Sequence, residues 1–174
     1  MKNSLFGILI MLLASGSLMA QSKKEKQEKK LEQKNVAYEA TKKLIESGSY
    51  IFDAERVTAR SMGGISLNHM QNGITVKNSE VEVNLPYFGV VRSAGYNRNP
   101  GITFKGIPEK YSVEYVDKKR RSIIKIGVRS STEYHDISLI VSSSGRTDVK
   151  VISSSRDNIS YSGYLLPIKE GTNN

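Results

Sequence analysis

The chain has 174 residues, 26 Lys and Arg against 17 Asp and Glu for a net charge of +9, and no Cys or Trp. This length suits one domain, and the lack of Cys excludes disulfides, thiol catalysis, cysteine-type zinc sites and a lipoprotein anchor. The positive charge allows anionic surfaces as partners, but net charge bears on association and not on fold or chemistry.

The first twenty residues have the layout of a secretory signal peptide. Lys2 precedes an apolar run from Leu5 to Leu13, and a stretch rich in small residues ends at Ala20. The apolar run is shorter than the roughly 20 residues that a membrane-spanning helix needs. We therefore predict cleavage near Ala20-Gln21, export to the periplasm or cell envelope, and no transmembrane segment in the mature chain. An uncleaved anchor is the alternative.

Residues 21–47 predict a charged helical lead-in. Lys, Glu and Gln dominate, all strong helix formers, and Glu25–Lys29 is an i,i+4 pair in the favourable orientation. Apolar residues come late, at Val36 and beyond, and Gly48 is placed to end the helix. The mixed charge favours a solvated helix over a basic helix that binds lipid or nucleic acid.

After Gly48 the apolar residues recur with a period of two. Val81, Val83 and Leu85 alternate with Glu80 and Glu82, which indicates strands with one buried face. Similar runs occupy 111–115, 124–128, 137–141 and 159–165, with turn clusters between them. The pattern predicts an all-β fold: an antiparallel up-and-down β-barrel over residues 48–168, preceded by the N-terminal charged helix and followed by a disordered tail at 169–174. A sandwich is the alternative, because it also buries one face of every strand.

The stretch from Pro86 to Gly101 predicts the longest loop. Long loops in compact domains are often functional, and aromatic and Arg side chains often anchor interfaces. We therefore regard five of its side chains as candidate ligand or partner contacts. The other interpretation is an aromatic plug over one end of the barrel. The five are Tyr87, Phe88, Arg92, Tyr96 and Arg98.

The strongest charge feature is a basic run between two predicted strands, Lys118, Lys119, Arg120 and Arg121. Long cationic side chains suit the polar tip of a hairpin, where they also discourage edge association. The functional alternative is docking to an anionic glycolipid or polysaccharide. Nucleic acid is not expected as a partner, because no nucleic-acid-binding motif is present and the charge is dispersed.

No spacing in the chain predicts catalysis, a metal site or a cofactor. His69 and His135 are far apart and belong to no ligand motif. His135 and Asp136 beside Glu133 suggest a metal site, but adjacent strand residues point to opposite faces, so a solvated hairpin is the favoured interpretation. We therefore expect no catalytic residue, no metal ligand and no enzyme.

Four short segments, in this order, resemble the landmarks of domain-of-unknown-function family 4251. They are LPYFG at 85–89, GITFKG at 101–106, YSVEY at 111–115 and ISYSG at 159–163. That family consists of small exported proteins of Gram-negative bacteria, and the resemblance covers about residues 40–168. It implies a β-barrel of lipocalin-like topology, and it carries no activity that could be transferred.

These observations together predict an exported, non-enzymatic β-barrel protein. Its interior or open end is expected to accept a small apolar or amphipathic ligand. The alternative is an interaction or structural module that contacts an envelope protein or an anionic glycan through the 86–101 loop or the 118–121 tip.

Overall fold

The computed structural model describes residues 2–59, 62–67, 72–91, 101–131 and 133–168. The chain divides into two compact units, Met1–Val36 and Ala37–Asn174. The first unit is the larger part of one helix, α1 (Lys2–Glu46), and its side chains from Lys23 to Val36 are exposed. The predicted N-terminal helix is confirmed. Among the described residues, no helix combines the length and apolar character needed to cross a membrane.

The last turns of α1 belong to the second unit and pack on its sheet. Tyr38 and Ile45 are buried there. The helix ends where the Ser47 amide donates to the Lys43 carbonyl at 3.0 Å and the Gly48 amide to the Ile45 carbonyl at 3.1 Å. Gly48 has a φ of +62°, a conformation that glycine adopts without strain, so it ends the helix as predicted.

The second unit consists mainly of antiparallel strands. The sheet order is β5-β4-β3-β1-β10-β9-β8-β7-β6, and β2 pairs only with β1. Six of the eight neighbouring pairs in this order are consecutive in the chain, as in an up-and-down order, and β1 instead lies between β3 and β10. The bounds are β1 (Tyr50–Ala59), β2 (Met62–Ser66), β3 (Gly73–Lys77), β4 (Glu80–Leu85), β5 (Ile102–Gly106), β6 (Lys110–Val116), β7 (Arg121–Arg129), β8 (Tyr134–Ser142), β9 (Arg146–Ser153) and β10 (Ile159–Pro167), with a short 3₁₀ turn, η1 (Asp117–Lys119), after β6.

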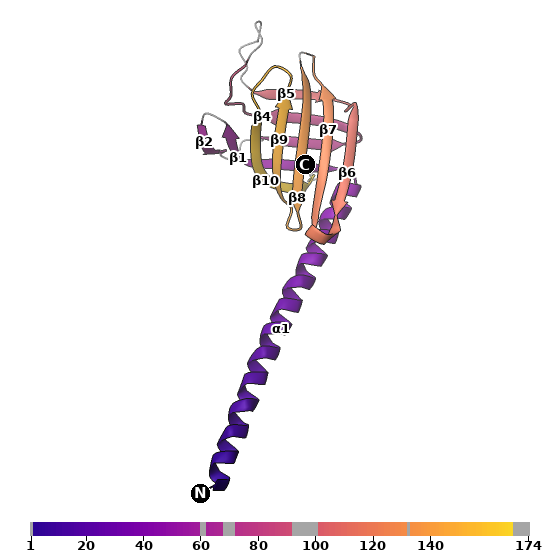
Figure 1. The fold of residues 1–174 in the computed structure, drawn as a ribbon. Helices are drawn as coiled ribbons and strands as arrows, with labels where there is room; N and C mark the ends of the chain where they lie inside the picture. Colours follow the sequence, from indigo (N-terminus) through magenta and orange to yellow (C-terminus); the bar gives the residue numbers. More distant parts are fainter. Residues whose placement is uncertain (1, 60–61, 68–71, 92–100, 132, 169–174) are drawn as a thin grey trace, which may run out of the picture. The chain divides into compact units, whose positions relative to one another are not determined.

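The sheet curls on itself to form a half-barrel. Figure 1 shows β6 to β10 crossing in front of β1, β3, β4 and β5. The strand order ends at β5 and β6, and within the described residues these two do not pair. The predicted closed barrel is thus replaced by a half-barrel with an open side. Only residues 107–109 join β5 to β6, and Pro108 has no amide hydrogen to offer a sheet ladder.

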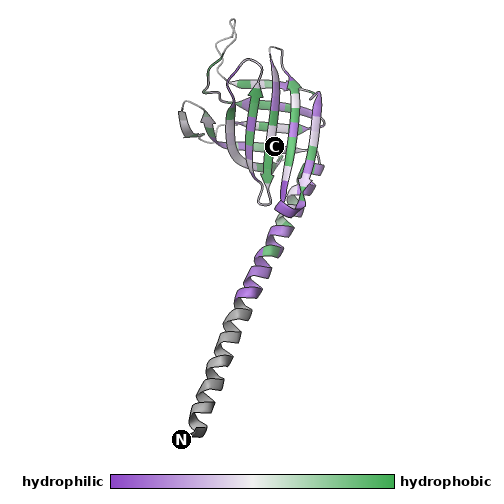
Figure 2. Ribbon diagram, in the orientation of Figure 1, coloured by the Kyte–Doolittle hydropathy of each residue, from purple (hydrophilic) through white to green (hydrophobic). Residues whose placement is uncertain are grey.

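The inward faces of the strands form one hydrophobic core. Figure 2 shows apolar residues recurring along the strands, and Val81 and Val83 are fully buried while Glu80 and Glu82 are exposed, as the alternation predicts. Side chains from β7, β8 and β10 fill the centre with at most 2% of their surface exposed. They are Ile124, Ile126, Val128, Leu139 and Tyr161. These residues occupy the centre themselves, so the space for a ligand lies on the open side.

Candidate functional site

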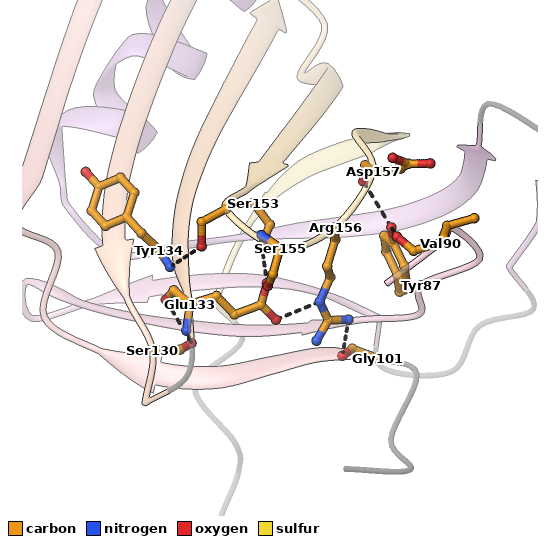
Figure 3. Close-up of polar contacts among 11 residues, drawn as sticks. Tyr87, Val90, Gly101, Ser130, Glu133, Tyr134, Ser153, Ser155, Arg156 and Asp157 are labelled. Carbon is orange, nitrogen blue, oxygen red and sulfur yellow. Dashed lines mark hydrogen bonds and ion pairs between the residues drawn. The ribbon is translucent and has the colours of Figure 1, made fainter. Parts of the chain in front are cut away.

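Two features of the second unit, Ala37–Asn174, called the β unit below, are candidates for a functional site. One is a buried cluster around Glu133 and Arg156, at the end of the half-barrel where residues 86–91 lie (Figure 3). The other is an apolar pocket on the open side, beside β6.

A tight turn before β8 directs Glu133 inward. The Ser130 amide donates to the Glu133 carbonyl at 2.8 Å, and the Glu133 amide donates to the Ser130 hydroxyl at 3.1 Å. Glu133 also has the same parity along the chain as His135 and Ile137, which face the core from β8. The turn and the strand therefore place a carboxylate inside the protein.

The Glu133–Arg156 cluster is held by a short ion pair. Arg156 Nε lies 2.7 Å from Glu133 Oε1, and the two side chains are only 4% and 2% exposed. The other carboxylate oxygen, Oε2, accepts hydrogen bonds from the Ser155 hydroxyl at 2.7 Å and from the Ser153 hydroxyl. Arg156 Nη1 donates to the Gly101 carbonyl at 3.0 Å. The cluster thus joins the β7–β8 turn, the β9–β10 turn and the start of β5.

Tyr87 belongs to the same cluster. Its ring lies 5.0 Å from the Arg156 guanidinium carbon, and its hydroxyl is 2.9 Å from the Val90 carbonyl and 3.1 Å from the Asp157 carbonyl, both acceptors. Tyr87 is buried, whereas its neighbour Phe88 is 37% exposed. The burial of Tyr87 is what the alternative interpretation, an aromatic plug over one end of the barrel, expects of this residue. The other candidates in the loop, Arg92, Tyr96 and Arg98, lie outside the described residues.

His135 lies near this cluster, and its position corrects the sequence-based interpretation. Glu133 and His135 are buried, so the expected solvated hairpin is wrong for both, while Asp136 is exposed on the opposite face. The ring of His135 stacks on Phe104 with centroids 4.7 Å apart, and among the described residues its Nδ1 has no hydrogen-bond partner. Burial lowers the pKa of His135 below its ordinary value, against the opposing effect of Glu133.

Among the described residues, the Glu133–Arg156 cluster is an internal network whose charged groups bond to one another. Both carboxylate oxygens of Glu133 already accept hydrogen bonds, and a side chain 2% exposed cannot reach an atom of a substrate that approaches from solvent. In the part of the chain that the structure describes, no group of three or more His, Asp or Glu side chains is arranged to hold a metal ion.

The open-side pocket has a volume of about 390 Å³, within the size range of small-molecule sites. It lies between the inward side of β6, the β3–β4 turn and the end of α1. Ile107 is 73% exposed and Tyr111 is 41% exposed, so apolar surface reaches the solvent here. The lining residues are Ile45, Glu46, Gly48, Val76, Ser79, Val81, Ile107, Pro108, Tyr111, Val113 and Tyr115.

One lining tyrosine of the open-side pocket, Tyr111, is bonded to a tyrosine of the core, Tyr50. The hydroxyls of Tyr50 and Tyr111 are hydrogen-bonded at 2.8 Å. Burial raises the pKa of Tyr50, and burial also raises the pKa of Tyr111, so this pair stays neutral at ordinary pH. The sequence pattern did not indicate this pocket, because its residues come from three separate segments, 45–48, 76–81 and 107–115.

The basic tip lies at the other end of β7, between β6 and β7. Lys118, Lys119 and Arg121 are exposed, and Arg120 has a φ of +49°. The preceding residue, Asp117, accepts a hydrogen bond from the Tyr38 hydroxyl at 3.0 Å. The structure therefore brings the four basic residues together, and it separates them from Tyr87 and Phe88.

Comparisons with known proteins agree with this fold. A family model described as "Domain of unknown function (DUF4251)" matches residues 32–165. The crystal structure of a DUF4251 family protein from Bacteroides eggerthii is similar to this chain, with 17% sequence identity, 78% of this chain and 91% of that chain covered, and a TM-score of 0.62. At this identity the likeness concerns the fold alone. No functionally curated protein matches this chain.

Proposed function

Since the chain belongs to the DUF4251 family, a family without an assigned activity, we propose that it is an exported, non-enzymatic binding protein of the periplasm or cell envelope. Its ligand is a small apolar or amphipathic molecule held in the open-side pocket. The observation that carries the proposal is the pocket itself, about 390 Å³ in volume and lined mainly by apolar side chains. The lipocalin-like topology implied by the family resemblance belongs to the same proposal.

Exposed apolar surface at the rim supports ligand binding. Ile107 is mostly exposed, and a ligand that covers apolar surface gains about 25 cal/mol per Å² removed from water. The two lining tyrosines, Tyr111 and Tyr115, provide both ring surface and hydroxyls, which suits a ligand with a polar end.

The pocket is tested with a fluorescent apolar probe, 1-aminoanthracene, and two substitutions at the pocket. Ile107→Asp and Val113→Asp are expected to weaken probe binding about tenfold or more, because each places a carboxylate in apolar surroundings. Ile140→Asp is the matched control, since Ile140 is an exposed isoleucine of β8 that does not line the pocket. Equal binding by all three variants and the parent protein would refute the pocket as the site.

Export is tested separately. The full chain is expressed in a Gram-negative host, and the N-terminus of the periplasmic protein is sequenced. The proposal expects a chain that begins at Gln21, and a Leu9→Arg variant, which interrupts the apolar run, should remain in the cytoplasm. A cytoplasmic parent protein that retains Met1 would refute export.

The second candidate function is contact with an envelope protein or an anionic glycan through the basic tip. It is favoured by the exposure of Lys118, Lys119 and Arg121 on one short turn. Dextran sulfate serves as the polyanionic probe, and triple replacement of these residues by Glu should abolish binding. Binding that survives the replacement would eliminate the tip.

A further inference from the structure

The open-side pocket is acidic although the protein is basic. Of the described residues that line it, Glu46 alone carries a charge, and the others are apolar, aromatic, hydroxyl or glycine residues. The whole chain has a net charge of +9. The local charge at the pocket therefore has the opposite sign to the charge of the protein.

The end of helix α1 adds to this negative charge. α1 ends at Glu46, and Ile45, Glu46 and Gly48 all line the pocket. The C-terminal end of a helix carries a partial negative charge equivalent to about half an elementary charge. A carboxylate and a helix C-terminus thus meet at one wall, and both favour a cation.

One aromatic ring of the pocket already has a cation of the protein beside it. The Lys42 ammonium lies 5.1 Å from the centre of the Tyr115 ring, within the range of cation–π interactions, so this ring is engaged by the protein and the charge preference of the pocket rests on Glu46 and the helix end. Burial raises the pKa of Tyr115, and the nearby Glu46 carboxylate raises it further. Tyr115 therefore remains neutral and close to the Glu46 charge.

The cation beside Tyr115 is already paired. Lys42 lies 3.4 Å from Asp117 Oδ1 and 3.8 Å from Glu39 Oε1, so two carboxylates neutralise it. The basic tip lines no part of the pocket, and its exposed charges are screened by salt over about 8–10 Å. An anionic ligand would find no unneutralised cation among the lining residues.

We propose that the ligand of the open-side pocket is an amphiphile with a cationic head, an amine or a quaternary ammonium, whose apolar body lies against β6 and whose head lies at Glu46. This inference rests on the proposed function, because it needs the open-side pocket to bind a small molecule. It assigns Glu46 as the residue that determines the charge preference.

The test compares three amphiphiles with the same twelve-carbon chain, by isothermal titration calorimetry below their micelle concentrations. They are dodecyltrimethylammonium, dodecyl maltoside and dodecanoate. We expect the cation to bind about tenfold tighter than the anion, the size of effect that one partly screened charge produces. The net positive charge of the protein alone would predict the reverse order.

Glu46→Gln should remove the preference. It is expected to weaken binding of dodecyltrimethylammonium about tenfold and to leave dodecyl maltoside unchanged. Glu82→Gln is the matched control, since Glu82 is an exposed carboxylate on the outward face of β4, and it should change neither.

The outcomes separate the two proposals. If dodecyl maltoside binds but the cation and the anion bind equally, or the anion binds tighter, the charge preference is overturned and the pocket stands. A preference that persists in Glu46→Gln also overturns the assignment to Glu46. If none of the three binds, both the inference and the proposed function are overturned.

Discussion

The substitution Arg156→Met tests whether the Glu133–Arg156 cluster stabilises the fold. Methionine keeps most of the length of the side chain and removes the guanidinium. Glu133 then retains the hydroxyl of Ser155 but loses its cation, at a position where its side chain is 2% exposed. The Gly101 carbonyl also loses a donor.

The expected loss follows from this burial. Removal of one partner from a buried ion pair costs about 3–5 kcal/mol, because the remaining charge stays desolvated and uncompensated. The protein offers a matched control in Arg129→Met. Arg129 Nε lies 3.1 Å from Glu109 Oε1, so this ion pair also joins an arginine Nε to a glutamate Oε1. Its side chains are 64% and 49% exposed, and exposed pairs contribute about 0.2–1 kcal/mol.

The free energy of unfolding is measured by urea denaturation. Tyrosine fluorescence reports on the β unit, since the chain has nine Tyr and no Trp. The double variant Glu133→Gln/Arg156→Met should recover part of the loss, because it leaves no buried charge. If Arg156→Met costs no more than Arg129→Met, the assignment of the cluster as a stabilising buried pair is refuted.

Three further predictions concern backbone packing, pH and the helix contact. Gly163→Ala should cost about 1–3 kcal/mol or more, because a Cβ there would collide with the Asp53 carbonyl of β1, whereas Gly63→Ala, with open space around it, should cost little; equal urea midpoints for the two would contradict this. The pKa of His135 is lowered by burial, so below about pH 6.5 the unfolded chain binds a proton that the folded protein does not bind. The free energy of unfolding therefore decreases as the pH is lowered, by up to about 1.4 kcal/mol per pH unit. His135→Leu should remove this part of the slope, and identical slopes between pH 7 and 5 would refute it. Tyr38→Phe, which removes the hydroxyl that contacts Asp117 Oδ1 and the Arg121 carbonyl, should cost about 1 kcal/mol and speed amide exchange over residues 37–46, and unchanged exchange there would argue against a role for this contact.

Much of the fold could be predicted because most strands alternate without interruption. β7 and β8 show buried residues at every second position over their length. β1 is harder to recognise, because its register shifts between Ala54 and Arg56. The buried set therefore changes parity, from Tyr50 and Phe52 to Val57 and Ala59, and a simple period of two ends at the bulge.

Of the Glu133–Arg156 pair, the sequence offers a signal for Glu133 only. Glu133 continues the parity of His135, Ile137 and Leu139, so a signal for its inward position was present in the alternation. Arg156 lies in the turn between β9 and β10, and nothing in its neighbours pairs it with a carboxylate 23 positions away. Such a pair depends on where two turns meet, which local patterns do not encode.

The open side could not be predicted from strand patterns. A closed barrel and a half-barrel bury the same face of each strand, so both produce the same alternation. The difference arises at residues 107–109, where the chain turns between β5 and β6 without forming a hairpin between them. The open-side pocket follows from that corner, and the sequence gives no residue spacing for it.

The pairing of β1 with β10 has a consequence for the order of folding. Tyr50 is opposite Pro167 and Ala59 is opposite Ile159. The first strand of the β unit, β1, can therefore pair with β10 only after the last strand has been synthesised. Contacts between such distant parts of a chain form slowly. The β1–β10 ladder, which joins the two halves of the sheet, is therefore the last part of the half-barrel that can form.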